Sequence, residues 1–113
     1  MNFSKELVRG SLPPIILRLL DERPMYGYEI VKLVNSRSNG LLEWKEGTLY
    51  PALHRLESDG LIRGEWRPGS TSAGATAARP RKYYCITRRG RTTLKERASE
   101  WSHFTSAVGM ILS

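Results

Sequence analysis

The sequence predicts a mainly helical protein with one small β-hairpin, and three observations support that fold class. Apolar residues recur at three- and four-residue steps in several segments, which is the periodicity of helices with one buried face. Two short stretches rich in strand-forming residues lie close together, separated by a run of small and polar residues. The length of 113 residues allows one hydrophobic core of modest size, so these elements should pack into a single folded unit.

The first helix is predicted around the segment 12–20. One face of this segment carries Leu12, Ile15, Ile16, Leu19 and Leu20. Pro13 and Pro14 fit an early turn of the helix or produce a local kink. The helix should end before Pro24, because a residue that precedes proline disfavours helical geometry.

A second and a third helix should follow over about residues 26–36 and 47–59. The apolar positions of these two segments are Ile30, Val31, Leu33, Val34, Leu49, Leu53 and Leu56. Asn39 and Gly40 mark the turn between the helices. Thr48 is the expected N-cap of the third helix, with Pro51 at the third helical position, although a start one or two residues earlier also fits.

Two strands are predicted after the third helix. Gly60 suits the left-handed backbone that ends a helix, and the residues from Ile62 to Arg67 then alternate as in a strand, with Trp66 expected in the core. Residues 82–86 form the second strand. The segment 68–78 holds no large apolar residue and is expected to be a mobile loop at the tip of the hairpin.

The last helix should begin after Thr87, which is a good N-cap residue. Its apolar and small positions, spaced by alternating steps of four and three, are Leu94, Ala98, Trp101, Thr105, Val108 and Leu112. This heptad spacing is typical of a helix that meets a second helix along one seam. We expect a homodimer interface formed by Leu94, Ala98, Trp101, Val108 and Leu112. Packing on the first helix is the alternative, and the two are compatible.

The excess positive charge lies in one stretch of the chain. Residues 79–97 hold eight Lys or Arg and one acidic residue, a sum of +7 that equals the net charge of the whole chain. Such a local excess indicates an anionic partner, with nucleic acid favoured over a membrane surface or a merely solvated face.

Three helices, a hairpin and a further helix follow each other in the order of a winged helix-turn-helix domain. In such folds the third helix enters the DNA major groove, and the hairpin, or wing, meets the neighbouring backbone or minor groove. We therefore divide the chain into a DNA-binding domain at residues 1–86, with the wing at about 62–86, and a dimerisation helix at residues 87–113 that packs on the first helix.

Candidate DNA contacts follow from this arrangement. They are Tyr26 at the start of the second helix, Thr48, Tyr50, Pro51, His54 and Arg55 on the exposed side of the third, and Arg79, Arg81 and Lys82 on the wing. Hydroxyl, ring and guanidinium groups suit phosphates and base edges, and a helix start favours a phosphate. Packing roles for Tyr26, Tyr50 and Pro51 remain open. So does the choice between DNA and solvent for the arginines at 88, 89 and 91.

Several blocks of the sequence resemble the PadR family of transcriptional regulators. They are YGYEI at 26–30, GTLYPALHRLE at 47–57, DGLI at 59–62 and RKYYCIT at 81–87. The resemblance extends over about residues 7–112, and the single short C-terminal helix is similar to the compact branch that includes multidrug-sensing repressors. It implies a homodimeric repressor that binds a palindromic operator and is often released by a small aromatic or lipophilic molecule.

The same resemblance indicates where such an effector would bind. In the drug-sensing relatives a tryptophan of the last helix stacks on flat ligands, and Trp101 is the matching residue here. Small neighbours leave room for a pocket, so the expected effector site comprises Pro14, Leu17, Arg18, Ala98, Trp101 and Thr105. An ordinary role in the dimer core is the alternative for Trp101.

Other function classes find little support in the sequence. No catalytic, phosphate-binding, dinucleotide-binding or metal-ligand motif is present, so we expect no enzyme, no cofactor and no metal. The single cysteine, Cys85, excludes an internal disulfide, and the absence of a leader-like or membrane-spanning segment indicates a cytoplasmic protein. A winged-helix module that binds RNA or another protein is the main alternative function, and a peripheral membrane protein is a weaker one.

Overall fold

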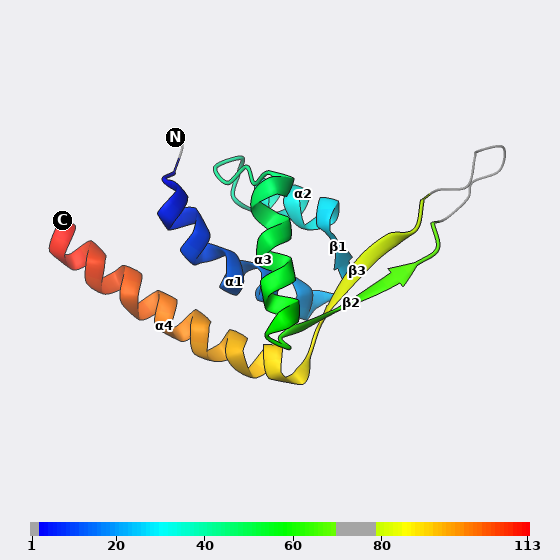
Figure 1. Ribbon diagram of the computed structural model, residues 1–113. Coiled ribbons are helices and arrows are strands. Elements are labelled where there is room, and N and C mark those ends of the chain that lie inside the picture. The colour runs from blue at the N-terminus through cyan, green and yellow to red at the C-terminus, as the bar shows by residue number, and fades with distance from the viewer. Residues whose placement is uncertain (1–2, 70–78) are drawn as a thin grey trace.

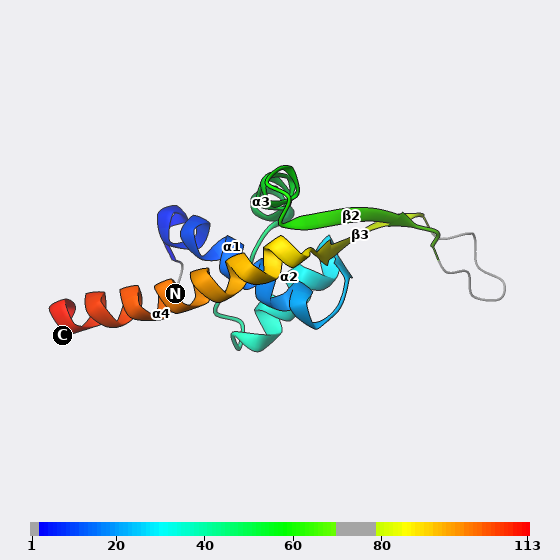
Figure 2. The ribbon, with the colours of Figure 1, turned by 90° about the horizontal axis from the view of Figure 1, so that it is seen from below.

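The computed structural model describes residues 3–69 and 79–113, which form four helices and one three-stranded sheet. The elements in chain order are α1 (Lys5–Glu22), β1 (Met25–Tyr26), α2 (Gly27–Arg37), α3 (Glu46–Ser58), β2 (Ile62–Arg67), β3 (Arg81–Ile86) and α4 (Arg88–Leu112). Helices α1, α2 and α3 form a central body, from which the β2–β3 hairpin and α4 extend in opposite directions (Figures 1 and 2). The predicted fold class is confirmed. Most of the expected mobile loop, residues 70–78, lies outside the described residues.

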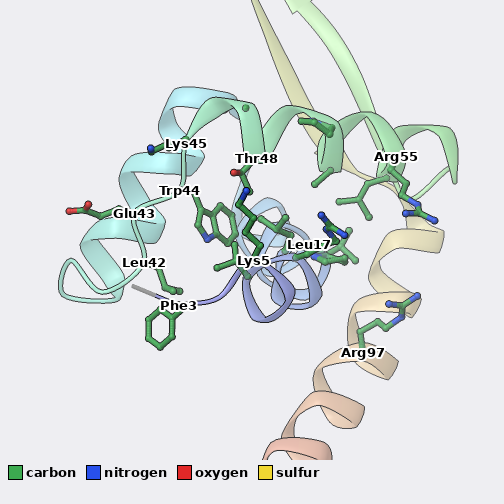
Figure 3. Close-up of a pocket in the computed structure, with 18 of the residues that line it drawn as sticks. Phe3, Lys5, Leu17, Leu42, Glu43, Trp44, Lys45, Thr48, Arg55 and Arg97 are labelled. Carbon is green, nitrogen blue, oxygen red and sulfur yellow. The ribbon is translucent and has the colours of Figure 1, made fainter. Parts of the chain in front are cut away.

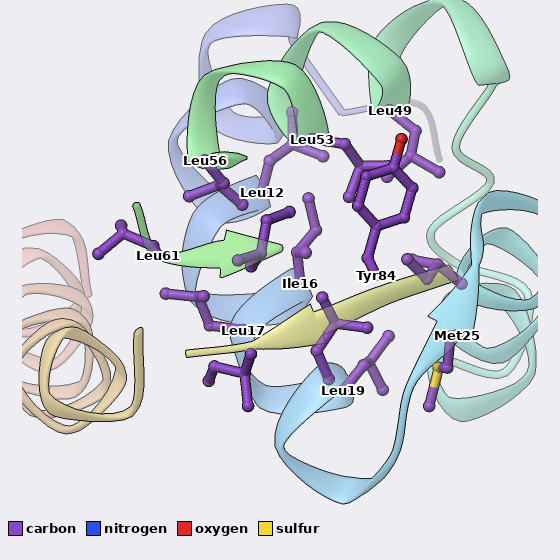
Figure 4. Packing of buried hydrophobic residues seen from close by; sticks show 14 of the residues in the cluster. Leu12, Ile16, Leu17, Leu19, Met25, Leu49, Leu53, Leu56, Leu61 and Tyr84 are labelled. Atoms are coloured by element: carbon purple, nitrogen blue, oxygen red, sulfur yellow. The ribbon is translucent and has the colours of Figure 1, made fainter. Parts of the chain in front are cut away.

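The core forms where α1, α3 and the root of the sheet meet (Figure 4). The apolar faces predicted from the sequence are the ones that are buried, with Ile16, Ile30, Leu49 and Leu53 having no exposed surface. Each such side chain stabilises the fold by about 1.5–3 kcal/mol. This burial fixes α3 so that its opposite side faces solvent.

Helix α1 starts earlier than its apolar pattern indicates. Ser4 is its N-cap and accepts a hydrogen bond from the Leu7 N–H at 3.4 Å. Pro13 and Pro14 therefore lie inside the helix, not in an early turn. Because prolines have no N–H group, the carbonyls of residues 9 and 10 receive no hydrogen bond within the helix. Residues 9 and 10 are exposed, so water can donate to these carbonyls instead.

The predicted N-cap of α3 is wrong, whereas its end is confirmed. Lys45 is the N-cap, and its carbonyl accepts the N–H groups of Thr48 and Leu49 at 3.0 Å each. Thr48 thus lies within the first turn of the helix. At the other end Gly60 has φ +75°, and the Gly60 and Leu61 N–H groups each donate at 3.0 Å to carbonyls of the last turn, as in a Schellman motif.

The sheet has a strand that the sequence did not reveal. β1 pairs antiparallel with β3, so the order is β1-β3-β2 and Tyr26 lies opposite Tyr83. Two residues are too few to show an alternating pattern. In β2, Ile62 is buried as expected, but Trp66 is 68% exposed, so its predicted core position is wrong. The hairpin extends beyond the helices, and its outer end has no core to cover.

Helix α4 is anchored at its first turn. The Thr87 hydroxyl accepts the Gly90 N–H at 3.0 Å, which confirms the predicted N-cap, and it lies 2.7 Å from the Gly60 carbonyl oxygen. Gly90 and Leu94 are the buried residues of α4. Leu94 thus belongs to the core of the single chain. The helix packs on α1 and then continues beyond the body (Figure 1). Several of its large apolar side chains are exposed.

Replacing Gly90 with Ala should destabilise the fold. A Cβ atom there would lie 2.1 Å from the Leu61 carbonyl oxygen and 2.7 Å from a side-chain carbon of Ile86. We expect the free energy of unfolding in urea to fall by about 2 kcal/mol or more. Gly109 is the matched control on the same helix, since a Cβ there meets nothing within 4 Å. Gly109→Ala should be neutral or slightly stabilising, and equal losses for both variants would contradict this packing.

Candidate nucleic-acid interface

The predicted contact residues of α3 share one exposed face of the helix. Thr48, Tyr50, Pro51, His54 and Arg55 are all exposed, while the leucines on the other side are buried in the core. The sequence pattern therefore assigned the two sides of α3 correctly. This face can reach a groove of a duplex without any rearrangement of the core.

Tyr50 is exposed and also packed at its ring. A Cβ atom placed on Gly27 would lie 2.5 Å from the Tyr50 hydroxyl oxygen and 2.8 Å from the carbon that bears it. The absence of a side chain at Gly27, which is buried, allows Tyr50 to rest on the first turn of α2. The packing role left open for Tyr50 is thus present, and it holds the phenol group at the exposed surface.

Tyr26 belongs to a row of four side chains that joins α2 to the wing. The Arg81 guanidinium donates a hydrogen bond to the Tyr26 hydroxyl at 2.9 Å and lies 4.4 Å from the centre of its ring. Tyr26 meets Tyr83 edge to face at 5.3 Å, and Arg67 lies 4.5 Å from the centre of the Tyr83 ring. We call Arg67, Tyr83, Tyr26 and Arg81 the arginine–tyrosine row. It orders Arg81 while leaving that residue exposed.

A second connection joins the wing to α3 through the Glu57 carboxylate. Its oxygens accept the Gly64 N–H at 2.9 Å and a hydrogen bond from the Lys82 ammonium at 3.1 Å. The Lys82 hydrogen bond is the main reason that the pKa of Glu57 lies below its usual value, with the Gly64 N–H adding to the effect. Lys82, predicted as a phosphate contact, is therefore half-buried and ion-paired. Arg79 and Arg81 remain exposed on the same hairpin.

A hollow of about 520 Å³ opens between α3, the start of α2 and the wing. Its lining combines four tyrosine rings and one tryptophan ring with two cations near the predicted contact surface. The lining residues are Tyr26, Gly27, Tyr28, Tyr50, Trp66, Pro80, Arg81, Lys82 and Tyr84. The sequence did not single out Gly27, Tyr28, Pro80 or Tyr84 as contact residues, and its pattern predicted a core position for Trp66. For Trp66 the strand register was the usable signal, because Trp66 pairs with Lys82 near the outer end of the hairpin.

The residues expected around an effector differ in exposure within the described part of the chain. Trp101 is 37% exposed, and a Cβ atom on Gly10 of α1 would lie 4.0 Å from its ring. Ala98, Thr105 and Arg18 are exposed, and Pro14 is half-buried. Leu17 instead has no exposed surface, because it packs in the hydrophobic core. Its side chain is thus separated from the exposed side of Trp101.

A broad groove of about 1330 Å³ runs between the N-terminal half of α1, the loop 40–45, α3 and Arg97 of α4 (Figure 3). Leu17 and Trp44 lie at its apolar bottom, and Arg55 and Arg97 lie on the same side of it. Trp101 does not line this groove. Of the predicted DNA contacts, Thr48, Pro51 and Arg55 border it, so one side of the groove is continuous with the exposed face of α3.

The described part of the chain shows neither a metal centre nor a membrane-spanning helix. Across residues 3–69 and 79–113, no three side chains of His, Cys, Asp or Glu gather closely enough to bind a metal ion. No helix in these ranges is long and apolar enough to cross a bilayer.

Comparison with known proteins assigns this geometry to a family. The transcriptional regulator PadR-like family matches residues 16–96. An uncharacterized protein from Lysinibacillus sphaericus is 36% identical over 107 residues, which cover 95% of this chain and 93% of that protein. A transcriptional regulator from Clostridium thermocellum has a similar structure, with TM-score 0.82, 32% identity and coverage of 99% of this chain and 100% of that one. A PadR family transcriptional regulator from Eggerthella lenta has a TM-score of 0.75 and 35% identity, and the match covers 96% of this chain and 87% of that one.

Replacing Glu57 with Gln should remove a pH-dependent part of the stability. The pKa of Glu57 is lowered in the folded chain. Its carboxylate therefore stabilises the fold above the unfolded pKa, and this contribution is lost as the pH falls through the folded pKa. The difference in free energy of unfolding between wild type and Glu57→Gln should shrink as the pH falls below the ordinary pKa of a glutamate, about 4.3. Urea unfolding at several pH values measures it.

Glu22 offers the matched control for this experiment. Its pKa is also lowered, chiefly by a hydrogen bond from Arg37 away from the wing. In a Glu22→Gln background the pH-dependent effect of Glu57→Gln should persist unchanged. A difference between wild type and Glu57→Gln that does not vary with pH would contradict the role given to the Glu57 carboxylate.

Proposed function

Since this chain belongs to the PadR-like family of transcriptional regulators, which bind DNA and are not enzymes, we propose that it is a repressor of a palindromic operator. It binds as a homodimer and is released by a small aromatic or lipophilic effector at the dimer interface. The observation that carries the proposal is the exposed polar face of α3 beside a basic wing. Its place of action is the cytoplasm, where the operator is found.

The proposed DNA contacts are divided between α3 and the wing. On α3, His54 and Arg55 have the freedom of exposed side chains and suit base edges, with Thr48, Tyr50 and Pro51 beside them. On the wing, Arg79 and Arg81 suit phosphates, and Tyr26 supports Arg81 through its hydrogen bond. Lys82 contributes less to phosphate binding than the arginines, because the Glu57 carboxylate pairs with its ammonium group.

Helix α4 supports the proposed homodimer. Its outer half carries apolar side chains that the described part of the chain leaves largely exposed, namely Phe104, Met110, Ile111 and Leu112, and Trp101 is 37% exposed beside α1. Burying this apolar surface against a second copy would remove it from water and stabilise the dimer. In this proposal residues 87–113 act as the dimerisation helix and residues 1–86 bind DNA. Val108 continues the seam, and Leu94 stabilises its root from within the core.

The proposed effector site lies at the same seam. Trp101 offers an exposed part of its ring next to α1, and the short side chains of Ala98 and Thr105 flank it on α4. Pro14 and Arg18 of α1 supply an apolar and a cationic border. Two copies of this surface facing each other would enclose a pocket between them, and a flat ligand there would shift the dimer between two shapes.

Replacing Arg55 with Ala should abolish or relax operator recognition and leave the fold intact. Arg55 is exposed, so its loss creates no cavity, while one bidentate base contact contributes about 1–3 kcal/mol of discrimination. A footprint on the promoter of the chain's own gene measures this change. Arg37→Ala is the control, because Arg37 pairs with Glu22 away from α3. An unaltered footprint for Arg55→Ala would remove Arg55 from the interface.

Replacing Val108 with Glu should convert the dimer to a monomer, because two carboxylates would face each other on the apolar seam. Light scattering during gel filtration measures the mass, and Ser106→Glu, off the seam on the same helix, should remain dimeric. A Val108→Glu variant that stays dimeric would contradict the proposed interface.

Flat lipophilic compounds should quench the fluorescence of Trp101 in the wild-type dimer and lower its affinity for the operator. A panel of such compounds that produces neither effect would count against the effector site.

A further inference from the structure

We propose that Trp66 is a DNA contact of the wing, with its indole ring lying against the sugar and base edges of the duplex. The inference rests on the proposed function, and it adds a residue that the resemblance and the charge pattern do not single out. Three features of the structure carry it, namely the exposure of the ring, the face of the hairpin on which it lies and the charge around it.

The exposure of Trp66 has no structural explanation within the described chain. The ring is 68% exposed, whereas the preceding residue on the same face of β2, Gly64, is partly covered by Glu57 of α3. Tryptophan gains stability from burial of its large apolar ring. A tryptophan left outside at the outer end of a hairpin therefore suits a surface that is covered when a partner binds.

The register of the hairpin fixes which way this part of the wing faces. Side chains alternate along a strand, so Ile62, Gly64 and Trp66 share one face. Ile62 lies in the core and Gly64 donates to Glu57, so this is the face that α3 covers near the root of the hairpin. Trp66 continues the face outward, beyond the end of that cover. It consequently borders the hollow between α3 and the wing.

The charge and chemistry of that hollow favour duplex DNA as the occupant. Arg81 and Lys82 line it together with the phenols of Tyr26 and Tyr50. The Arg81 guanidinium and the phenols suit the phosphates of one strand, whereas the Lys82 ammonium is held by Glu57. If α3 fills the major groove and the wing reaches the neighbouring minor groove, the strand between the two grooves must pass between α3 and the wing. An apolar ring on the wing side of that path meets sugars and the edges of the minor groove.

The contact can be tested on the intact chain with 5-fluorotryptophan and a duplex from the promoter of its own gene. The sequence has three tryptophans, and the Trp66 signal is the ¹⁹F resonance that disappears in Trp66→Phe. Adding the duplex should shift this resonance and leave that of Trp44, which is buried, in place. Trp66→Ala should weaken duplex binding roughly tenfold, the scale of one lost aromatic contact. Trp66→Phe should recover most of the affinity.

The control variant is Glu65→Gln, on the opposite face of the same strand, which should bind at least as tightly as wild type. If wild type binds the duplex while Trp66→Ala binds equally well and the Trp66 resonance does not move, the inference is overturned and the proposed function stands. Binding of no duplex by wild type overturns both. A Trp66 resonance that shifts with protein concentration alone identifies a second copy as the occupant and overturns the DNA contact. If Trp66→Ala does not fold, the shift of the Trp66 resonance in wild type is the test, and a resonance that the duplex does not move overturns the inference.

Discussion

The carboxylate of Glu57 is the constraint on which the proposed interface depends. It lies on α3 and accepts hydrogen bonds from the backbone of β2 and from the side chain of β3, so one residue joins the exposed helix to both strands of the wing. The arginine–tyrosine row makes a second, independent connection between the wing and the start of α2. A helix and a hairpin connected at two places keep a nearly fixed spacing. A rigid spacing of this kind lets two elements engage adjacent grooves without an additional entropic cost of ordering them.

The same constraint redistributes the charge that the sequence shows. All of the net charge of +7 can be assigned to residues 79–97, but the ammonium of Lys82 is paired with Glu57 in the structure. Among the wing residues of that stretch, Arg79 and Arg81 then carry the free positive charge, while α3 carries Glu46 and Glu57 beside Arg55. In the proposed function the flanking arginines supply most of the electrostatic affinity, and the nearly neutral helix supplies the choice of sequence.

The sequence was sufficient for the parts of the fold that repeat a pattern. The leucines of α3 and the alternation in the hairpin specify buried faces, and Gly60 specifies the end of a helix. It was insufficient where a feature is too short or depends on distant contacts. Strand β1 has two residues, Lys45 caps α3 through its backbone, and Trp66 alternates correctly but lies beyond the core. Leu17, expected at the effector site, is buried for a similar reason, because the spacing of apolar residues does not show how deeply a helix lies in the core. The seam on α4 stays a prediction because it requires a second chain.

Competition binding shows whether the frame of α3 and wing reads duplex DNA. The chain is titrated against a labelled duplex from its own promoter, with RNA of the same length and unrelated duplex as competitors, at about 50 and about 200 mM salt. Only the promoter duplex should compete efficiently, and the affinity should fall steeply at the higher salt. Equal competition by RNA, or an affinity that is the same at both salt concentrations, would contradict the proposed function.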